Sequence, residues 1–294
     1  MYAIECKNLT HYYGKKLIYE NLSFNVEEGK ILGLLGKNGT GKSTTINILN
    51  GFLQPTSGEC LIYGENTQRL SPETKMRIGF LIEGHIQYTF MNIHQIEKFY
   101  SGFYPKWNSA PYWELMSKLK VTPKQKISNM SCGQRSQVAL GLILAQDPDL
   151  LILDDFSMGL DPGYRRLFID YLREYAKAEH KTIFTTSHII QDMERLIDDV
   201  LIMDYNRILA QQPIEHFMAN FKQFNILLKD HEAVIPHTDL AINIERVKDT
   251  VEFYTYAQGS DVKAFLDNSG IEYLSFSEKK MSLEDAFIGL TRKY

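Results

Sequence analysis

The chain has 294 residues, of which 44% are hydrophobic and 23% are charged, a composition typical of globular proteins. This length is sufficient for one large domain or for two domains with separate cores. The formal net charge of −4 argues against a general nucleic-acid-binding protein, because such proteins carry a basic surplus.

Three further features bear on where the protein works. The cysteines Cys6, Cys60 and Cys132 show no C-x-x-C spacing, which predicts a reduced, cytosolic compartment. The N-terminal residues form no apolar core of the kind found in signal peptides, so we expect no secretion. No run of about 18 apolar residues occurs, and the sequence therefore predicts no membrane-spanning helix.

Two strands come before the most informative stretch of the chain. Residues 1–7 and 22–26 alternate apolar and polar side chains, which predicts an edge hairpin followed by a turn at residues 27–30. Tyr13 lies at the loop of this hairpin. Its ring can pack on the hairpin or stack on a planar base, and the residues alone favour packing.

The apolar residues 31–35 run directly into the phosphate-loop pattern G-x-x-x-x-G-K-[ST]. Glycines let the backbone approach phosphate oxygens closely, and successive N–H groups then form a nest for an anion. The following helix, expected from about residue 42 to Gly51, directs its positive end at the same place. Lys42 is expected to reach the β- and γ-phosphates of ATP, and the Ser43 hydroxyl to hold Mg²⁺. The candidate nucleotide-binding residues here are Gly36, Lys37, Asn38, Gly39, Thr40, Gly41, Lys42, Ser43 and Thr44.

An aromatic-rich segment runs from about residue 84 to residue 126, after a strand expected at 76–82 that ends at Glu83. Apolar residues recur at helical spacing, as at Ile93 and Ile96, which predicts a helical subdomain inserted between strands. We expect most of the aromatic residues to form its core, and a few near Glu83 to form a docking surface. They are Tyr88, Phe90, Phe99, Tyr100, Phe103, Tyr104, Trp107, Tyr112 and Trp113.

A second helix start and a buried strand follow. Ser131 is a good N-cap residue for a helix that Pro148 ends. Residues 150–153 are continuously apolar, which is typical of a central parallel strand. Asp154 and Asp155 then lie at its carboxyl end, where α/β sheets bind their ligands. This is a Walker B pattern, in which Asp154 holds Mg²⁺.

The strand expected at 181–187 ends in His188, again at the carboxyl edge of the sheet. This position favours a contact with the γ-phosphate over a structural role, whereas the other histidines lack metal-ligand spacing and are expected at the surface. Between the two strands, a helix is expected from Pro162 to about residue 178. Its apolar stripe is expected to be Leu167, Tyr171 and Tyr175.

After residue 221, strand signals alternate with short helix signals, and Ser282 and Asp285 resemble a capping box. The fold class predicted for the whole chain is α/β. It comprises a P-loop NTPase core with a mostly parallel sheet, an antiparallel β subdomain, an inserted helical subdomain and a small C-terminal α+β appendage. The expected divisions are a nucleotide-binding domain at 1–220, its helical subdomain at about 84–148, and an accessory domain at 221–294.

The order of these motifs resembles that of the ATP-binding cassette (ABC) ATPases over residues 1 to about 220. The resemblance implies that residues 36–44 are the Walker A motif, that Asp155 is the general base and that His188 is the switch histidine. Tyr13 looks like the aromatic residue that stacks on adenine. Glu83 falls at the Q-loop position, which implies a role at the Mg²⁺ and in catalysis.

The resemblance also implies a site shared between two subunits. Ser131, Gly133 and Gln134 look like the signature motif, which contacts the γ-phosphate of the nucleotide on the partner subunit, and Asp161 looks like the D-loop residue. A homodimer or heterodimer of such subunits would hold two ATP and Mg²⁺. It would drive a separate transmembrane permease from the inner face of the cell membrane, without nucleic acid. The C-terminal appendage is similar to those of bacterial drug, antimicrobial-peptide and lantibiotic-immunity exporters.

Several positions depart from the family pattern. Asp155 replaces the usual Glu, Phe156 the usual Pro and Glu83 the usual Gln, and the signature reads MSCGQ. A carboxylate displaced by about 1 Å can cost on the order of 100-fold in rate, so hydrolysis is slow unless Phe156 repositions the backbone. The alternative to an active exporter subunit is a regulatory subunit that binds ATP, scarcely hydrolyses it and pairs with an active ATPase. A DNA-repair or translation ATPase fits less well, because the chain has a single P-loop and no basic surplus.

Overall fold

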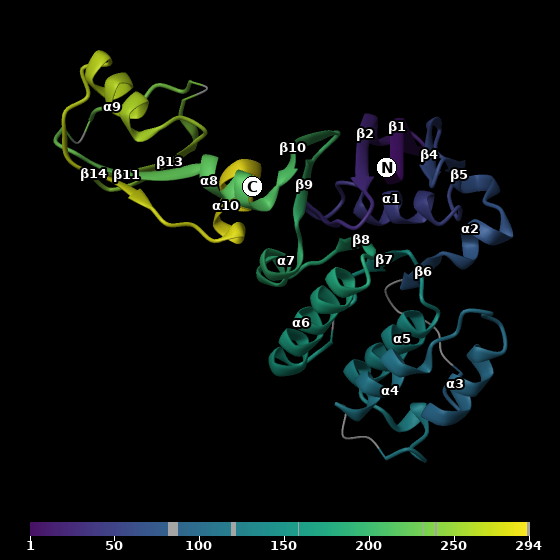
Figure 1. Cartoon of the computed structure of the whole chain (residues 1–294). Coiled ribbons are helices and arrows are strands. Elements are labelled where there is room, and N and C mark those ends of the chain that lie inside the picture. Colours follow the sequence, from purple (N-terminus) through teal and green to yellow (C-terminus); the bar gives the residue numbers. More distant parts are fainter. Residues whose placement is uncertain (82–87, 119–121, 158, 231, 239, 293–294) are drawn as a thin grey trace. The chain divides into compact units, whose positions relative to one another are not determined.

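The computed structural model describes residues 1–81, 88–118, 122–157, 159–230, 232–238 and 240–292 (Figure 1). The chain divides into two compact units, Met1–Ile208 and Leu209–Tyr294. The division that we expected after residue 220 differs from this one by the segment 209–220, which holds most of β10 and all of α8.

A six-stranded sheet with the order β10-β9-β3-β8-β7-β6 organises the first unit. Neighbouring strands from β9 to β6 pair in parallel, so their carboxyl ends lie at one edge of the sheet. The expected parallel strand β7 is buried on both faces, but it lies next to the outermost strand β6 rather than in the centre. The strands are β3 (Ile31–Gly36), β6 (Ile78–Leu81), β7 (Leu150–Asp154), β8 (Thr182–Thr186), β9 (Asp199–Asp204) and β10 (Arg207–Pro213).

A second, antiparallel sheet of the first unit has the order β2-β1-β4-β5. Its strands are β1 (Tyr2–Tyr13), β2 (Lys16–Glu27), β4 (Ser57–Ile62) and β5 (Glu65–Asn66). The first two strands form the expected hairpin, and with β4 they build the antiparallel β subdomain that the sequence predicted. Phe24 of β2 stacks on Phe184 of β8, with ring centroids 5.9 Å apart, so the two sheets share one core.

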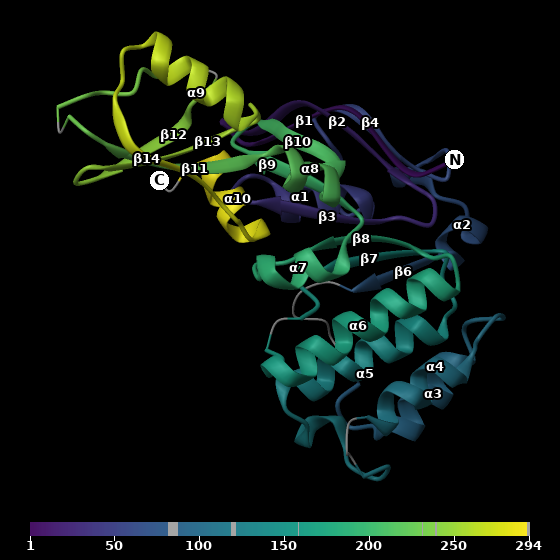
Figure 2. The ribbon, with the colours of Figure 1, turned by 60° about the vertical axis from the view of Figure 1, so that its left-hand side comes forward.

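In the described part of the first unit, five α-helices connect the strands and two more form the helical subdomain (Figure 2). Of the stripe that we predicted for α6, Tyr171 is buried, whereas Leu167 and Tyr175 are half-buried. The other buried residues of α6 are Phe168, Ile169, Leu172 and Ala176. The connecting helices are α1 (Lys42–Leu49), α2 (Pro72–Met76), α5 (Cys132–Ala145), α6 (Pro162–Ala178) and α7 (Ile190–Leu196). The subdomain helices are α3 (Ile93–Ser101) and α4 (Ser109–Ser117).

Most aromatic residues of the helical subdomain are not in its core, contrary to our expectation. Only Tyr112 is buried, and its hydroxyl donates to the Ile93 carbonyl at 2.7 Å. Two short helices packed on α5 enclose little volume, and aliphatic side chains such as Ile96 and Leu115 already fill it. The remaining rings are half-buried or exposed. The exposed ones are Tyr88, Phe90 and Phe103.

The second unit is a four-stranded antiparallel sheet with the order β12-β13-β11-β14 and three helices. Its elements are α8 (Ile214–Asn220), β11 (Lys222–Leu228), β12 (Ile242–Val247), β13 (Thr250–Thr255), α9 (Gly259–Asn268), β14 (Tyr273–Lys279) and α10 (Leu283–Thr291). Ser282 and Asp285 form the predicted capping box at α10, since the Asp285 N–H donates to the Ser282 hydroxyl at 3.1 Å. The unit therefore has the α+β character expected of the appendage.

We predict that Gly289→Ala destabilises the second unit. A Cβ atom at Gly289 would lie 2.2 Å from Cδ1 of Tyr254, a ring that is buried against α10. Overpacking of this kind costs about 1–3 kcal/mol, and denaturant unfolding of the full chain measures the loss. Gly259→Ala is the matched control, because its Cβ would meet Phe224 at an ordinary 3.5 Å. Equal unfolding midpoints for the two variants would contradict the prediction.

Candidate functional site

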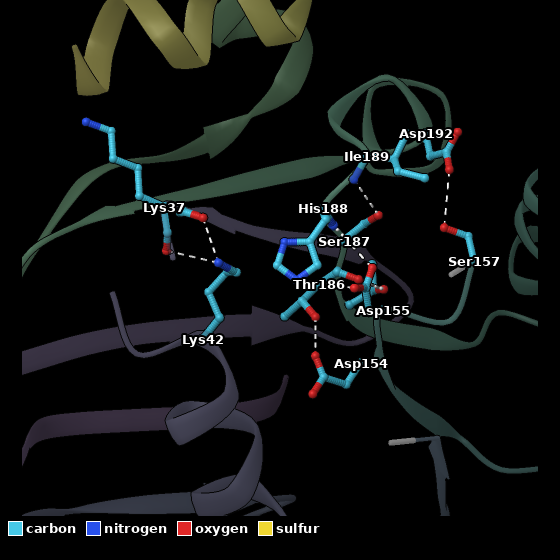
Figure 3. A network of polar contacts seen from close by, with 12 residues as sticks. Lys37, Lys42, Asp154, Asp155, Ser157, Thr186, Ser187, His188, Ile189 and Asp192 are labelled. Carbon is cyan, nitrogen blue, oxygen red and sulfur yellow. Dashed lines mark hydrogen bonds and ion pairs between the residues drawn. The ribbon is translucent and has the colours of Figure 1, made fainter. Parts of the chain in front are cut away.

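The candidate site lies at the carboxyl ends of three neighbouring strands (Figure 3). The register of the sheet pairs Leu34 of β3 with Thr186 of β8, and Thr186 with Asp154 of β7. The segments that follow these strands therefore start at the same level of the sheet. Lys42 follows β3, His188 follows β8 and Asp155 follows β7, so the structure brings together the residues that the sequence placed at strand ends.

The phosphate loop is closed around its own lysine. Lys42 Nζ donates to the carbonyl oxygens of Gly36 at 2.7 Å and of Lys37 at 3.1 Å. The Thr40 hydroxyl also donates to the Lys37 carbonyl, at 2.9 Å, and fixes the turn. The side chain of Lys37 itself extends away from Lys42 (Figure 3). The loop thus presents one ammonium group at the start of α1.

Glycine is required at two positions of this loop for different reasons. A Cβ atom at Gly36 would lie 2.5 Å from the Thr40 hydroxyl oxygen, which would block the turn. Gly41 has a φ of +102°, and a Cβ atom there would lie 2.7 Å from the ring of Tyr19, which is fully buried on β2. The antiparallel sheet therefore packs directly against the loop and fixes its shape.

The electrostatics of the site centre on Lys42, which is only 9% exposed. Burial lowers the pKa of its ammonium group below the usual value, and the carboxylates of Asp154 and Asp155 partly oppose this lowering. A buried cation that is only partly compensated favours a further negative charge beside it. The site is therefore suited to an anion such as a phosphate group.

Two adjacent carboxylates have different partners. Asp154 accepts a hydrogen bond from the Thr186 hydroxyl. Asp155 accepts one from the backbone N–H of His188 at 3.2 Å, and its second oxygen lies 3.3 Å from His188 Nε2 without hydrogen-bond alignment. The sequence motifs did not identify Thr186 as a site residue. A hydroxyl side chain at the end of a strand, two residues before His188, was the signal that could have identified it.

The backbone of Asp155 is unusual. Its φ of +49° is left-handed, a conformation that few side chains adopt and that aspartate tolerates better than most. The side chain is only 6% exposed, and the Asp155 N–H donates to the Thr186 carbonyl at 3.2 Å. The carboxylate is therefore held close to His188 by the chain around it.

The signature residues lie on another part of the first unit. Ser131 caps α5, because its hydroxyl accepts from the Gln134 N–H at 3.2 Å while the Gln134 side chain accepts from the Ser131 N–H at 3.0 Å. Gly133 faces Gly159, whose carbonyl oxygen would lie 3.0 Å from a Cβ atom. Helices α1 and α5 are well separated in both views of the ribbon (Figures 1 and 2). The structure thus does not join the phosphate loop and the signature residues within one chain.

Two further candidates have distinct outcomes. Tyr13 is 50% exposed, and His11 contacts its ring edge-on with centroids 4.8 Å apart. The expectation that all other histidines lie at the surface was wrong for His11, which is buried behind Tyr13 on β1.

Glu83 lies outside the residues that the structure describes.

The donor set fits a nucleotide and a hard cation. The phosphate loop offers N–H groups and one ammonium, while the Ser43 hydroxyl and the Asp154 carboxylate supply the oxygen donors that Mg²⁺ prefers. Within the described residues no cluster of three or more His, Cys, Asp or Glu side chains could hold a metal by itself. No described helix combines the length and the apolar character needed to cross a membrane.

Comparisons with known proteins identify relatives among ABC transporter proteins. The ABC transporter family profile matches residues 19–157. The chain is 32% identical to the bacitracin transport ATP-binding protein BcrA of Bacillus licheniformis, over 98% of this chain and 96% of that protein. It is 29% identical to the Nod factor export ATP-binding protein I of Cupriavidus metallidurans, over 98% and 97% of the two chains.

A solved structure described as the ATP-binding subunit of an ABC transporter has the same fold. It covers 74% of this chain and 92% of its own length, with a TM-score of 0.65 and 25% identity. With this fold, the phosphate loop and a relative more than 30% identical over nearly the whole length, the chain belongs to the ATP-binding subunits of ABC transporters.

Proposed function

We propose that this chain is the ATP-hydrolysing subunit of a bacterial membrane exporter whose cargo is a peptide, a drug or another amphipathic compound. The observation that carries the proposal is the match, over 98% of the chain, to proteins named for bacitracin transport and Nod factor export. This match extends through the second unit as well as the first, so it is not limited to features common to all cassettes.

ATP is bound by the phosphate loop in this proposal. The backbone N–H groups of residues 36–44 and the Lys42 ammonium contact the phosphates, and the exposed ring of Tyr13 stacks on adenine. The buried His11 behind Tyr13 supports this role, since it restrains the ring edge-on while leaving half of the tyrosine exposed. Ser43, Asp154 and Glu83 are the proposed ligands of Mg²⁺, which neutralises phosphate charge when it is bound.

Hydrolysis in this proposal depends on Asp155 and His188. Asp155 accepts the proton of the attacking water, and His188, adjacent to Asp155, contacts the γ-phosphate from the end of β8. Glu83 assists at the Q-loop position. An aspartate reaches one methylene less far than glutamate, so we propose that turnover is slow. Positioning and electrostatic stabilisation supply the rate enhancement, as is general for phosphoryl transfer.

Two subunits complete each site in this proposal. Ser131, Gly133 and Gln134 lie at the start of α5, where the helix dipole favours a phosphate, and the side chain of Ser131 is exposed there. Their separation from the phosphate loop of the same chain supports a partner subunit as the source of that phosphate. Both a homodimer and a heterodimer with a second ABC ATPase satisfy this arrangement.

A separate transmembrane permease is the proposed membrane partner. The exposed aromatic surface of the helical subdomain, defined by Tyr88, Phe90 and Phe103, supports this proposal. Phe90 and Phe103 are each 65% exposed, and large exposed rings that cluster on a surface are typical of protein interfaces. Docking through this surface would place the subunit at the inner face of the cell membrane.

We expect Lys42→Ala to weaken ATP binding about tenfold or more, because it removes charge-assisted hydrogen bonds to phosphate. Isothermal titration of the purified full chain with ATP in Mg²⁺-free buffer measures this loss. Lys37→Ala is the matched control, since it deletes the same charge from the same loop but leaves the backbone intact. Equal affinities for the two variants would remove Lys42 from the proposed site.

We expect Asp155→Asn to lower the steady-state ATPase rate at least tenfold, and Asp155→Glu to raise it above the wild-type rate. The first change removes the base, and the second extends its reach toward the water. A phosphate-release assay at saturating ATP compares the three proteins. A wild-type rate no higher than that of Asp155→Asn would identify the chain as an ATP-binding regulatory subunit instead.

We expect the double change Phe90→Ser and Phe103→Ser to abolish co-purification with a polypeptide that has several apolar spans. The measurement is affinity purification from detergent-solubilised membranes, with identification of the partner by mass spectrometry. Leu274→Ser removes an exposed apolar side chain from the second unit and serves as the control. Retention of the spanning partner by the aromatic variant would contradict docking through this surface.

A further inference from the structure

The loop that follows β7 has to hold Asp155 in a conformation that is costly by itself. A left-handed backbone for a residue other than glycine costs on the order of 1 kcal/mol and persists only where its surroundings enforce it. One hydrogen bond, from Asp155 N–H to the Thr186 carbonyl, fixes the residue from the side of β8. The Asp155 carboxylate accepts a second hydrogen bond, from the His188 N–H at 3.2 Å. The residues that follow Asp155 need a restraint of their own.

The carboxylate of Asp192 supplies this restraint from α7. Asp192 is buried, and one of its oxygens accepts from the Ser157 hydroxyl at 3.2 Å (Figure 3). Its other oxygen accepts from Arg165 Nε at 3.1 Å. Arg165 lies near the start of α6, so this ion pair joins α7 to α6. A single side chain therefore connects the loop, the helix after it and α7.

Helix α7 is also joined to the segment that carries His188. It begins two residues after His188, and the Ile189 N–H donates to the Ser187 hydroxyl at 3.0 Å (Figure 3). Asp192 thus lies on the element that continues from His188 and holds the loop that continues from Asp155. The distance between Asp155 and His188 depends on this connection as well as on their direct contact.

The same loop reaches the start of α5 on its far side. A Cβ atom at Gly159 would lie 3.2 Å from Cys132 Sγ, and one at Gly133 would lie 3.0 Å from the Gly159 carbonyl oxygen. The residues around Gly159 therefore pack closely against the start of α5.

We propose that Asp192 is a positioning residue for ATP hydrolysis, which holds the loop at Ser157 so that the Asp155 carboxylate stays beside His188. The inference rests on the proposed catalytic role of Asp155. It is distinct from simple attachment of α7 to α6, because a second ion pair, Arg195 with Asp170 at 2.8 Å, already joins these two helices at the surface.

The first test measures the loop without any turnover. Asp192→Asn keeps the size of the side chain but removes the charge that holds Ser157 and Arg165. Hydrogen exchange of the full chain is followed by mass spectrometry in the peptide covering residues 155–161. We expect exchange at least tenfold faster in Asp192→Asn than in wild type, because the loop opens locally. Asp170→Asn, which breaks the surface pair of the same two helices, is expected to leave this peptide unchanged.

The second test separates kcat from KM. We expect Asp192→Asn to lower kcat about tenfold or more while the KM for ATP changes less than twofold, since the partners of Asp192 are Ser157 and Arg165 rather than residues 36–44. Ser157→Ala removes only the branch to the loop and keeps the ion pair, so it guards against a folding defect. It is expected to lower kcat in the same direction, whereas Asp170→Asn retains the wild-type value.

Each outcome decides the proposal. Equal exchange of the 155–161 peptide in Asp192→Asn and Asp170→Asn would overturn it, as would an unchanged kcat in both Asp192→Asn and Ser157→Ala. A parallel loss of kcat and of ATP affinity would also overturn it, because that pattern indicates general damage. A wild-type protein without turnover would defeat the proposed hydrolysis, while the exchange measurement would still decide whether Asp192 holds the loop.

Discussion

The alignment of parallel strands β3, β8 and β7 at one edge of the sheet is the constraint on which the site depends. It brings a buried ammonium, that of Lys42, to the same level as the carboxylates of Asp154 and Asp155. Burial alone would make this cation costly, and the carboxylates compensate it only in part. The packing of the core therefore favours the binding of a further anion beside Lys42, and the glycines of the loop leave room for that anion.

Much of the site could be predicted because its signals are local in sequence. The loop from Gly36 to Ser43, the cap at Ser131 and the strand-end residues Asp154 and His188 each follow from a short pattern and the element beside it. The fold class was confirmed for the same reason, since the motif order specifies the order of strands and helices. The nucleotide-binding residues of the loop remain a prediction about chemistry, supported here by geometry.

The rest could not be predicted because it depends on which elements pack together. The buried face of α6 was predicted only in part, since Tyr171 is buried as expected but Phe168 and Leu172 are buried as well, against neighbours that the helix pattern alone does not identify. His11 reads as an exposed loop residue, and only the packing of β1 buries it. Asp192 belongs to no motif, and its role emerges from contacts with Ser157 and Arg165 that are 35 and 27 residues away in sequence.

The left-handed backbone of Asp155 links two departures from the family pattern that look independent in the sequence. A proline at position 156 would push the residue before it toward extended conformations, far from the φ of +49° found here. Phe156 removes that restriction and is itself buried, so it anchors the turn from within the core. Aspartate, whose short side chain suits left-handed geometry, then occupies the position that phenylalanine makes accessible. The two positions are therefore coupled through one backbone conformation, and restoring proline at position 156 alone would work against the φ found at Asp155.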